Sequence, residues 1–510
     1  MYERIPIKRG SFFFCPLLPW DGVNIVEGVN MKGLHSIRKI ADIFSGFSTT
    51  RKIALGFATV ILAGAILLTL PISSSTGEST SFIDALFTAT TSVCVTGLVT
   101  VVTATHWSLF GHIVILILIQ LGGFGVICCG IWILQLLRRK IHLKDRKMIQ
   151  ESYGLDGEIA GDVVNKDIKK NISNYDGLVK RIVRGTFIIE GIGAMLLAVR
   201  FIPQFGPAKG IWYSIFHAVS AFCNAGIDVL SEVSLMEYKG DALVNLTICF
   251  LIITGGIGFI VWWDVVRVIK QAIAQRKYKN MLFKRLSLHS KVAITTTIVL
   301  IIIGTVGIFC FEYSNEKTMA NESVGTKLLM SLFQSVTPRT AGYFTMLQEN
   351  MTSPSYLLTI ILMLIGGSPM GTAGGMKTTT IAMVIFCIVG VVKGKKDIEA
   401  FGRRISSENI RMGITVIAIS LMTLVLGVML LLVVEPFGIR PIVYETVSAI
   451  ATVGLGYGMT PYLTATGKLV LILLMYIGRT GPITMAMVFG SRQGKEQKGV
   501  QLAEKKIIIG

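Results

Sequence analysis

Four short glycine-centred segments contain the residues of this 510-residue chain that are best suited to chemistry. The last of them reads Thr452-Val453-Gly454-Leu455-Gly456. It differs at one position from the TVGYG loop, in which backbone carbonyl oxygens replace the water shell of a cation. Glycine at the turn permits backbone angles that place carbonyl oxygens on one axis. The segment therefore predicts coordination of a cation by the backbone.

Three looser copies of this segment precede it in the chain. They read Val95-Thr96-Gly97, Asn224-Ala225-Gly226 and Thr340-Ala341-Gly342. The four central glycines are 129, 116 and 112 residues apart, and each lies between two long apolar segments. An aromatic residue also precedes each glycine by nine or ten positions, namely Phe87, Phe216, Phe333 and Tyr444. Glycines also let membrane helices pack closely, but four copies in one register favour a repeated pore loop over that explanation.

The composition is that of a membrane protein. Hydrophobic residues make up 52% of the chain and charged residues 15%, whereas about a quarter of the residues in a soluble protein are charged. Uncharged apolar stretches close to or above the length of a spanning helix, about 20 residues, cover residues 53–70, 107–137, 243–263, 292–311, 356–376 and 414–434. Two further stretches, 182–199 and 469–489, are interrupted by charges. We therefore expect an all-α integral membrane protein in a lipid bilayer.

Basic residues are unevenly distributed among the loops. Loops 138–181, 265–291 and 393–411 together hold 25 lysine and arginine residues, whereas loops 71–106, 203–242, 314–354 and 435–466 hold 6. This positive-inside pattern places the basic loops and both termini in the cytoplasm. It also argues that the net charge of +19 does not serve to bind nucleic acid. No catalytic set or metal-ligand cluster stands out, so we expect neither an enzyme nor a metal site beyond the permeating cation.

Each glycine segment is expected to belong to a unit of a long helix, a short half-spanning helix, the glycine loop and a second long helix. Four such units would surround a central pore with pseudo-fourfold symmetry. The expected organisation is a cytoplasmic segment 1–50, pore repeats 51–137, 178–272, 288–393 and 409–490, and a cytoplasmic tail 491–510. In the second repeat, residues 243–270 are expected to form one continuous helix.

The second long helix of the third repeat is predicted to break in mid-membrane, because one proline and five glycines fall within ten positions. We interpret the broken segment as a gate across the permeation path. It comprises Gly366, Gly367, Ser368, Pro369, Gly371, Thr372, Ala373, Gly374, Gly375 and Lys377. A kinked, tightly packed helix is the alternative. A phosphate-binding loop is a poorer match, because Met376 occupies the position of its required glycine.

Charged residues near these segments complete the candidate site. Arg479 lies in an apolar segment at the depth of the broken helix, where charges are costly and usually functional. It would act as an electrostatic barrier, or it would anchor the gate by hydrogen bonds to carbonyl groups that the broken helix leaves unpaired. The alternative is that its side chain snorkels toward the membrane surface or pairs with a residue of another helix. On the outer side, Asp84, Asp228 and Glu445 would raise the local cation concentration or would simply be solvated.

Together these motifs resemble the Trk/Ktr/HKT superfamily of potassium transporters, and most of all the membrane subunit of bacterial Ktr-type uptake systems. The likeness covers the chain from about residue 50 to its end. It is carried by residues 90–98 (TTSVCVTGL), 120–125 (QLGGFG), 139–146 (RKIHLKDR), 150–152 (QES) and 504–510 (EKKIIIG).

The resemblance implies potassium as the permeant ion and sodium as a candidate promoter of uptake. It implies that residues 95–97, 224–226, 340–342 and 452–454 form a K+ selectivity filter, and that residues 366–375 form a gate loop beside Arg479. At position 97 the chain has glycine and not serine, and in this respect it is similar to the potassium-selective members of the superfamily.

The resemblance also implies an assembly. The subunit would form a homodimer in a bacterial plasma membrane, on a cytosolic ring of RCK-type nucleotide-binding regulatory subunits. ATP or ADP would bind that ring rather than this chain, and residues 393–404 are candidate contacts for it.

Two alternative functions remain open. One is a symporter that couples K+ stoichiometrically to another cation, and the other is a membrane receptor without flux.

Overall fold

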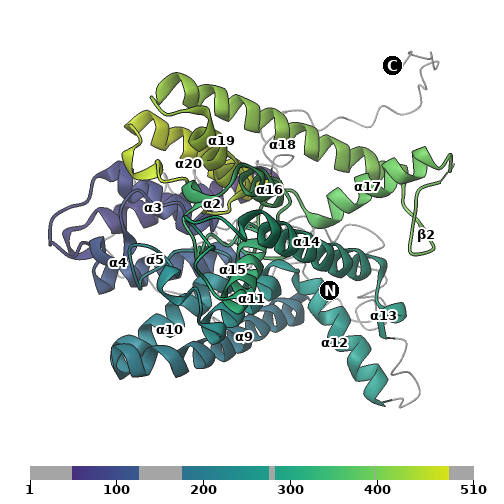
Figure 1. Cartoon of the computed structure of the whole chain (residues 1–510), viewed down its shortest axis with the longest axis horizontal. Coiled ribbons are helices and arrows are strands. Elements are labelled where there is room, and N and C mark those ends of the chain that lie inside the picture. The colour runs from purple at the N-terminus through teal and green to yellow at the C-terminus, as the bar shows by residue number, and fades with distance from the viewer. Residues whose placement is uncertain (1–48, 126–174, 275–281, 396, 482–510) are drawn as a thin grey trace, which may run out of the picture.

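The structure, a computed structural model, describes residues 49–125, 175–274, 282–395 and 397–481. The tail 491–510, nearly all of the segment 1–50 and most of the basic loop 138–181 lie outside the described residues. Within the described part the fold is helical, and its only strands form a hairpin of β1 (Glu399–Ala400) and β2 (Arg403–Arg404) (Figure 1). The expected helical architecture is confirmed.

A long helix followed by a short one recurs four times along the described chain. The pairs are α2 (Thr49–Thr69) with α3 (Phe82–Cys94), α9 (Tyr175–Phe205) with α10 (Pro207–Phe222), α14 (Leu288–Glu312) with α15 (Val324–Val336), and α18 (Ser407–Val434) with α19 (Ile439–Ala451). In each pair the two helices pack against each other. The short helices have 13 to 16 residues, which at 1.5 Å per residue is too short to cross a bilayer core of about 30 Å.

The long helices have the length and composition of membrane spans. Residues Arg51–Thr69, Lys180–Phe205, Leu288–Glu312 and Ser407–Val434 are each apolar and long enough to cross a bilayer. The helix α18 also leaves large apolar side chains exposed, among them Met422, Leu426 and Val433. Exposed apolar surface of this extent belongs against lipid rather than water.

A second helix follows each short one, and its start is marked by a polar cap in three cases. These second helices are α5 (Leu109–Phe124), α11 (Ala242–Gly256), α16 (Ser353–Leu364) and α20 (Ala465–Thr480). The side chains of Ser108, Asp241 and Thr464 accept hydrogen bonds from backbone N–H groups in the first turns of α5, α11 and α20. Such caps satisfy donors that a helix start leaves unpaired. The α16 start uses Glu312 instead, which accepts from the Thr352 N–H at 2.9 Å.

The expected continuous helix over residues 243–270 is wrong. The chain bends by 98° between α11 and α12 (Phe259–Ala274). Gly258, with a φ of +95°, lies at the bend, and Pro369 O occupies the position that a side chain on it would take. The Phe259 N–H donates to Met370 O at 3.0 Å. The bend is therefore stabilised by the segment 365–377, which lies more than a hundred residues further along the chain.

The predicted break in the third repeat is confirmed. Residues 365–377 separate α16 from α17 (Thr378–Val392), and Ile365 pairs with Met376 across the base of this segment. The Ser368 N–H donates to Gly256 O at 2.8 Å and the Thr372 N–H to Gly255 O at 3.1 Å. The two broken helices thus satisfy each other's backbone groups, as buried irregular backbone at membrane depth requires.

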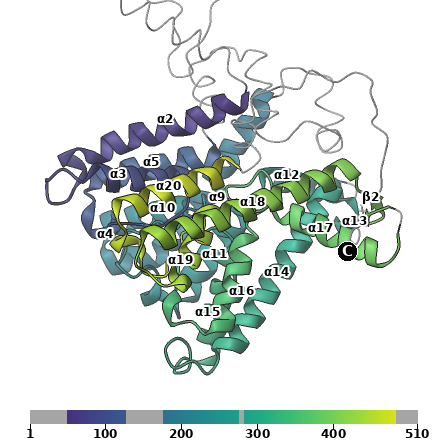
Figure 2. The same cartoon turned by 90° about the horizontal axis from the view of Figure 1, so that it is seen from above.

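The two ends of the molecule are formed by different elements, and their loops differ in the number of basic residues. Figures 1 and 2 show α12, α17 and the β1–β2 hairpin extending away from the side that carries α3 and α4 (Thr103–His106). The described parts of the basic loops 265–291 and 393–411 therefore lie on the same side, opposite the loops that are poor in basic residues. This arrangement agrees with the alternation that the charge distribution predicted.

Candidate functional site

The four glycine loops meet in a closed ring. The position of a side chain on Gly97 is occupied by Ala225 O, and that on Gly226 by Ala341 O. A side chain on Gly342 would lie 2.8 Å from Val453 O, and one on Gly454 would meet Thr96 O. Each loop thus lies against the next in chain order, and the fourth lies against the first. The structure brings together all twelve residues that the sequence analysis selected.

The four loops share an unusual backbone conformation. Val95, Asn224, Thr340 and Thr452, each two residues before a central glycine, have φ angles between 52° and 69°. The four glycines also have positive φ, between 62° and 101°. Left-handed backbone is rare for β-branched residues and costs on the order of 1–3 kcal/mol where it occurs. Its recurrence at one position in four loops indicates a functional requirement rather than chance.

Hydroxyl groups at the ends of the short helices hold the loops. Thr91 Oγ1 accepts from the Gly97 N–H at 2.9 Å, and Ser448 Oγ accepts from the Gly454 N–H at 3.0 Å. Ser220 Oγ bonds both the N–H and the C=O of Ile227, and Thr337 Oγ1 donates to Tyr343 O. These four residues were not predicted from the sequence. Their signal is a serine or threonine five or six positions before each central glycine.

The aromatic register noted in the sequence marks the buried core of the short helices. The side chains of Phe87, Phe216, Phe333 and Tyr444 are all fully buried. The Tyr444 hydroxyl also donates to Gln348 Oε1 at 2.8 Å. Burial of such large side chains, each contributing about 1.5–3 kcal/mol, supports the rigidity of the helices that carry the ring.

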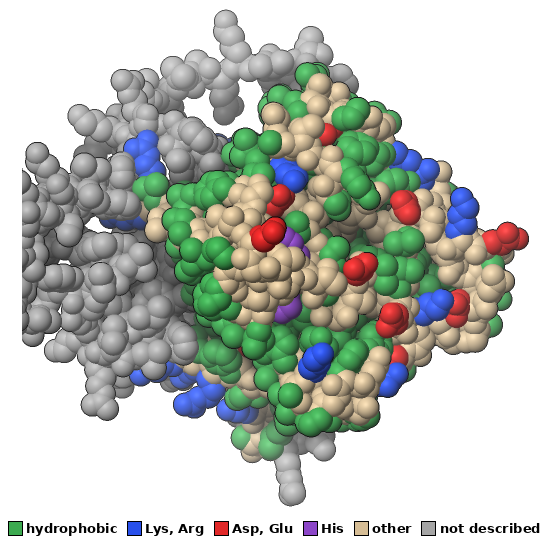
Figure 3. Space-filling model, turned by 90° about the vertical axis from the view of Figure 1, so that its left-hand side faces the viewer, with side chains coloured by type: hydrophobic (Ala, Val, Ile, Leu, Met, Phe, Trp, Pro, Cys, Tyr) green, Lys and Arg blue, Asp and Glu red, His purple; other side chains and the backbone are tan. Residues whose placement is uncertain are grey.

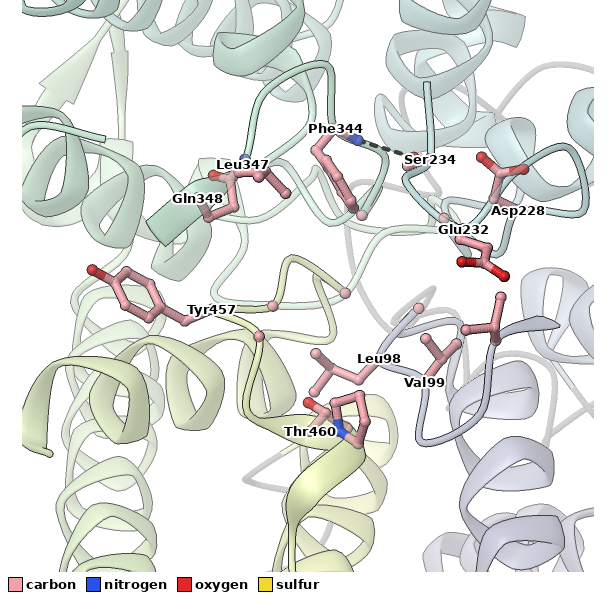
Figure 4. Close-up of a pocket in the computed structure, with 18 of the residues that line it drawn as sticks. Leu98, Val99, Asp228, Glu232, Ser234, Phe344, Leu347, Gln348, Tyr457 and Thr460 are labelled. Carbon is pink, nitrogen blue, oxygen red and sulfur yellow. Dashed lines mark hydrogen bonds between the residues drawn. The ribbon is translucent and has the colours of Figure 1, made fainter. Parts of the chain in front are cut away.

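An acidic cavity of about 270 Å³ lies on one side of the ring, and all four central glycines line it. Among the residues that the structure describes, its charged lining residues are Asp228, Glu232, Glu349 and Glu445, and none of the lining residues is a lysine or an arginine. Figure 4 shows Asp228 and Glu232 at its edge. In Figure 3, which views the face nearest α4, acidic and histidine side chains gather near the middle. Carboxylates without basic neighbours at a cavity mouth attract cations.

The three predicted entrance carboxylates have different positions. Asp228 lines the cavity. Glu445 also reaches it, but is fully buried and accepts from the backbone N–H groups of Tyr457 and Met459, so its main role is to hold the chain after the fourth loop. Asp84 pairs with Lys468 at 2.6 Å, and it is not a free carboxylate at the entrance. Glu232 and Glu349 were not selected from the sequence.

The segment 365–377 lies on the opposite side of the ring. The Thr372 hydroxyl has one hydrogen to donate, and it lies within hydrogen-bond distance of two acceptors, Phe222 O at 3.0 Å and Asn224 Oδ1 at 3.2 Å. The Gly374 N–H donates to Thr340 Oγ1 at 3.3 Å. These contacts involve the residues at the start of the glycine loops, whereas the acidic cavity is lined by the glycines and the residues that follow them. The segment and the cavity are therefore separated by the ring.

Arg479 anchors this segment. Its guanidinium donates to Thr372 O and to Gly122 O, from α20 to the broken segment and to α5. Lys377 Nζ donates to Ala373 O at 2.7 Å within the segment itself. The Thr372 and Ala373 carbonyl groups belong to the broken segment and lie outside any helix, whereas Gly122 O also accepts from the Gly125 N–H at the C-terminal cap of α5. Arg479 therefore contacts a carbonyl group of the broken segment, Thr372 O. This is the contact that the anchoring role predicted from the sequence requires.

The fold and this site define a helical membrane protein in which four glycine loops meet between an acidic cavity and a broken helix. The chain belongs to the TrkH family of cation transport proteins, whose family profile matches residues 44–497.

The relatives agree with this assignment. The chain is 40% identical to the potassium/sodium uptake protein NtpJ of Enterococcus hirae, over 91% of this chain and 97% of that protein. It is 39% identical to the Ktr system potassium uptake protein B of Bacillus subtilis, over the same shares of the two chains. The crystal structure of TrkH from Vibrio parahaemolyticus shares the fold, with a TM-score of 0.66 at 15% identity over 88% of this chain and 86% of that one. The recognised resemblance is confirmed.

Proposed function

We propose that this chain is the potassium-translocating membrane subunit of a gated cation uptake system. The observation that carries the proposal is the closed ring of four glycine loops with one recurring backbone conformation. Carbonyl oxygens of residues 95–97, 224–226, 340–342 and 452–454 would replace the water shell of the ion. The units 51–137, 178–272, 288–393 and 409–490 would then be pore repeats with pseudo-fourfold symmetry about the ring.

The short helices support a cation as the permeant ion. Each of them ends within five residues of its glycine loop's first residue, so its C-terminal end faces the ring region. That end carries a partial negative charge from the aligned peptide dipoles. Four such ends and an acidic cavity together favour a cation over an anion. The names of the relatives from Bacillus subtilis and Enterococcus hirae support potassium as this cation, with sodium as a second ion to be tested.

The segment 366–377 is proposed as the gate. Its residues Thr372 and Gly374 bond to two of the four loops directly, so that an ion leaving the ring on that side would have to displace it. The hydrogen bonds from Arg479 hold it in place. The positive charge of Arg479 would also act as an electrostatic barrier next to the path, because cations repel each other strongly at low dielectric.

The same relatives and the charge distribution support a proposed assembly. Two of the relatives are named as parts of a Ktr system, which supports a partner subunit. We propose a homodimer in a bacterial plasma membrane, with both termini cytoplasmic, on a cytosolic RCK-type ring that binds ATP or ADP. Residues 393–404 would contact the ring, since Lys395, Arg403 and Arg404 are exposed and the β1–β2 hairpin that follows α17 lies at the end of the molecule away from α4 (Figure 1).

Growth on limiting potassium tests the proposed function. The chain is expressed together with a candidate ring subunit in cells that lack their own potassium uptake. We expect rescue of growth and of potassium uptake, and we expect Gly454→Ala to abolish both while the protein still reaches the membrane. Absence of rescue by the unaltered chain, despite membrane insertion and partner binding, would contradict the proposal.

The acidic cavity leads to a separate prediction. Neutralising its two exposed carboxylates in the double variant E232Q/E349Q should slow potassium uptake at low ionic strength by about two- to fourfold, and the difference should vanish at high salt, because exposed charges act through a screened field. Initial uptake rates at several ionic strengths measure this effect. Glu316→Gln, which removes an exposed carboxylate outside this cavity, is the matched control. Equal slowing in both variants would exclude a role for the cavity.

A further inference from the structure

The side chain of Asn224, at the start of the second glycine loop, contacts two other parts of the molecule. Its Nδ2 atom lies 3.2 Å from Arg339 O and 3.4 Å from Thr340 Oγ1, at the start of the third loop. Its Oδ1 atom lies 3.2 Å from the hydroxyl of Thr372 in the segment 365–377. The side chains of Asn224, Thr340 and Thr372 are all buried. One amide therefore connects two loops of the ring with the broken segment.

The partners determine which end of the Asn224 amide faces which neighbour. A backbone carbonyl oxygen only accepts hydrogen bonds, so the group that faces Arg339 O is the Nδ2 group, which has two hydrogens to donate. The amide oxygen then faces the Thr372 hydroxyl, which can donate to it. A side chain that joins both neighbours in this way needs a donor and an acceptor on separate atoms, and an amide supplies them.

Asn224 differs from the residues at the same place in the other three loops. These are Val95, Thr340 and Thr452, and all four residues have left-handed backbone, with φ angles from 52° to 69°. Asparagine tolerates this conformation well, but the other loops adopt it with β-branched residues. Valine has no polar side-chain group, and Thr452 Oγ1 has no hydrogen-bond partner among the described residues. The asparagine is therefore explained by its contacts and not by its backbone.

Backbone atoms at the end of α11 lie close to the Asn224 amide. A side chain on Gly255 would lie 3.0 Å from Asn224 Oδ1, and one on Gly256 would lie 3.4 Å from Asn224 Nδ2. The carbonyl groups of these two glycines accept from the N–H groups of Thr372 and Ser368. Asn224 is 1% exposed, so loss of a partner leaves a buried polar group unpaired, which is costly. Displacement of the broken segment would therefore destabilise the position of the amide.

We propose that Asn224 is a positioning residue that ties the second filter segment to the third and to the gate, so that the gate contributes to the preference of the ring for potassium over sodium. This rests on the proposed function. With Thr372 bonded to it, the amide is held against Arg339 O, and residues 224–226 and 340–342 keep their spacing. Without that contact the amide is held on one side only, and the spacing relaxes. Selectivity then falls even though every carbonyl group of the ring is still present.

Sodium competition against rubidium uptake in proteoliposomes, with a candidate ring subunit present, tests this role. Asn224→Val introduces the residue type that the first loop has at the same place, Val95, with the same left-handed backbone, so the ring should still assemble. We expect its preference for rubidium over sodium to fall by about three- to tenfold, the range expected for loss of one or two hydrogen bonds. Thr372→Val removes only the hydroxyl, and we expect a fall of about threefold.

The double variant Asn224→Val/Thr372→Val separates this contact from general damage to the ring. If the two side chains act through each other, the second substitution adds nothing, and the double variant should keep the preference of Asn224→Val to within about twofold. Independent effects would multiply, so that the double variant would be about threefold less selective than Asn224→Val. That result is expected if the Thr372 hydroxyl acts through Phe222 O instead, and it would overturn the proposal.

Two further variants complete the test. Thr372→Ser retains the hydroxyl and should restore the preference of the unaltered protein. Asn321→Thr replaces an exposed asparagine in the loop before α15 and should also leave the preference unchanged. If Asn224→Val conducts no rubidium, equal preferences in Thr372→Val and Thr372→Ser would still overturn the role of the contact. No rubidium flux in the unaltered protein would instead contradict the proposed function.

Discussion

Substituting Gly97 by serine is expected to lower the preference for potassium over sodium by about tenfold or more. Gly97 has a φ of +101°, and Ala225 O occupies the position of the added side chain, with Gly454 Cα 3.2 Å away. Left-handed backbone costs a residue with a side chain about 1–2 kcal/mol, and the contact must displace the neighbouring loop. Each 1.4 kcal/mol or so changes a preference tenfold. Sodium competition against rubidium uptake in proteoliposomes measures this effect.

Gly77→Ser is the matched control for this experiment. Gly77 also has a positive φ, of +76°, but nothing lies within 4 Å of the position of an added side chain. It therefore reproduces the backbone strain without the crowding, and its selectivity should equal that of the unaltered protein. Unchanged selectivity in Gly97→Ser, in protein that inserts normally, would remove Gly97 from the filter.

Deleting residues 371–375 is expected to raise flux by about tenfold and to make it independent of the regulatory partner. The deletion removes Thr372 and Gly374, and with them the hydrogen bonds to Phe222, Asn224 and Thr340. Each neutral hydrogen bond contributes about 0.5–1.5 kcal/mol, so loss of the bond from the Thr372 hydroxyl and of the bond from the Gly374 N–H accounts for a tenfold effect. The fold should tolerate the deletion, because Ile365 and Met376 already pair at the base of the segment.

Rubidium flux with and without the partner measures this effect. Thr423→Val is a suitable control, since within the described part of the chain the Thr423 hydroxyl bonds only to its own helix, at Ile419 O, and its loss should leave flux unchanged. If the deleted protein conducts no faster than the unaltered one without its partner, the segment is not a gate.

The ring could be predicted from the sequence because its signal is local. The same pattern recurs in four places: a short apolar helix with an aromatic residue, followed at nearly constant spacing by a glycine. Each copy predicts the same backbone conformation. The break over residues 365–377 was equally clear, because proline and closely spaced glycines cannot continue a helix.

The bend at Gly258 could not be predicted in this way. Gly255, Gly256 and Gly258 read as the small residues that let membrane helices pack closely. The carbonyl groups of Gly255 and Gly256 leave the helical pattern because the N–H groups of Thr372 and Ser368 replace the helical donors, and those donors lie over a hundred residues away. The bend is a property of two segments together, and neither segment shows it alone.

The partners of the acidic residues depend on tertiary contacts as well. Asp84 and Lys468 are 384 residues apart in the chain, and their pairing follows from the contact between α3 and α20. Glu445 reads in the sequence as an entrance carboxylate, yet it is directed to backbone donors at Tyr457 and Met459. Charge pattern predicted which side of the membrane these residues face, but the structure was needed to show which carboxylates remain free.

We propose that the carbonyl oxygens of the four-loop ring bind a potassium ion. Thallium(I) has a size and charge close to those of potassium and scatters X-rays anomalously, so a crystal structure of the protein in thallium salt tests the claim most directly. We predict an anomalous peak inside the ring, coordinated by backbone oxygens of residues 95–97, 224–226, 340–342 and 452–454. An empty ring in protein that still conducts thallium, with the peak at another site along the path, would contradict it.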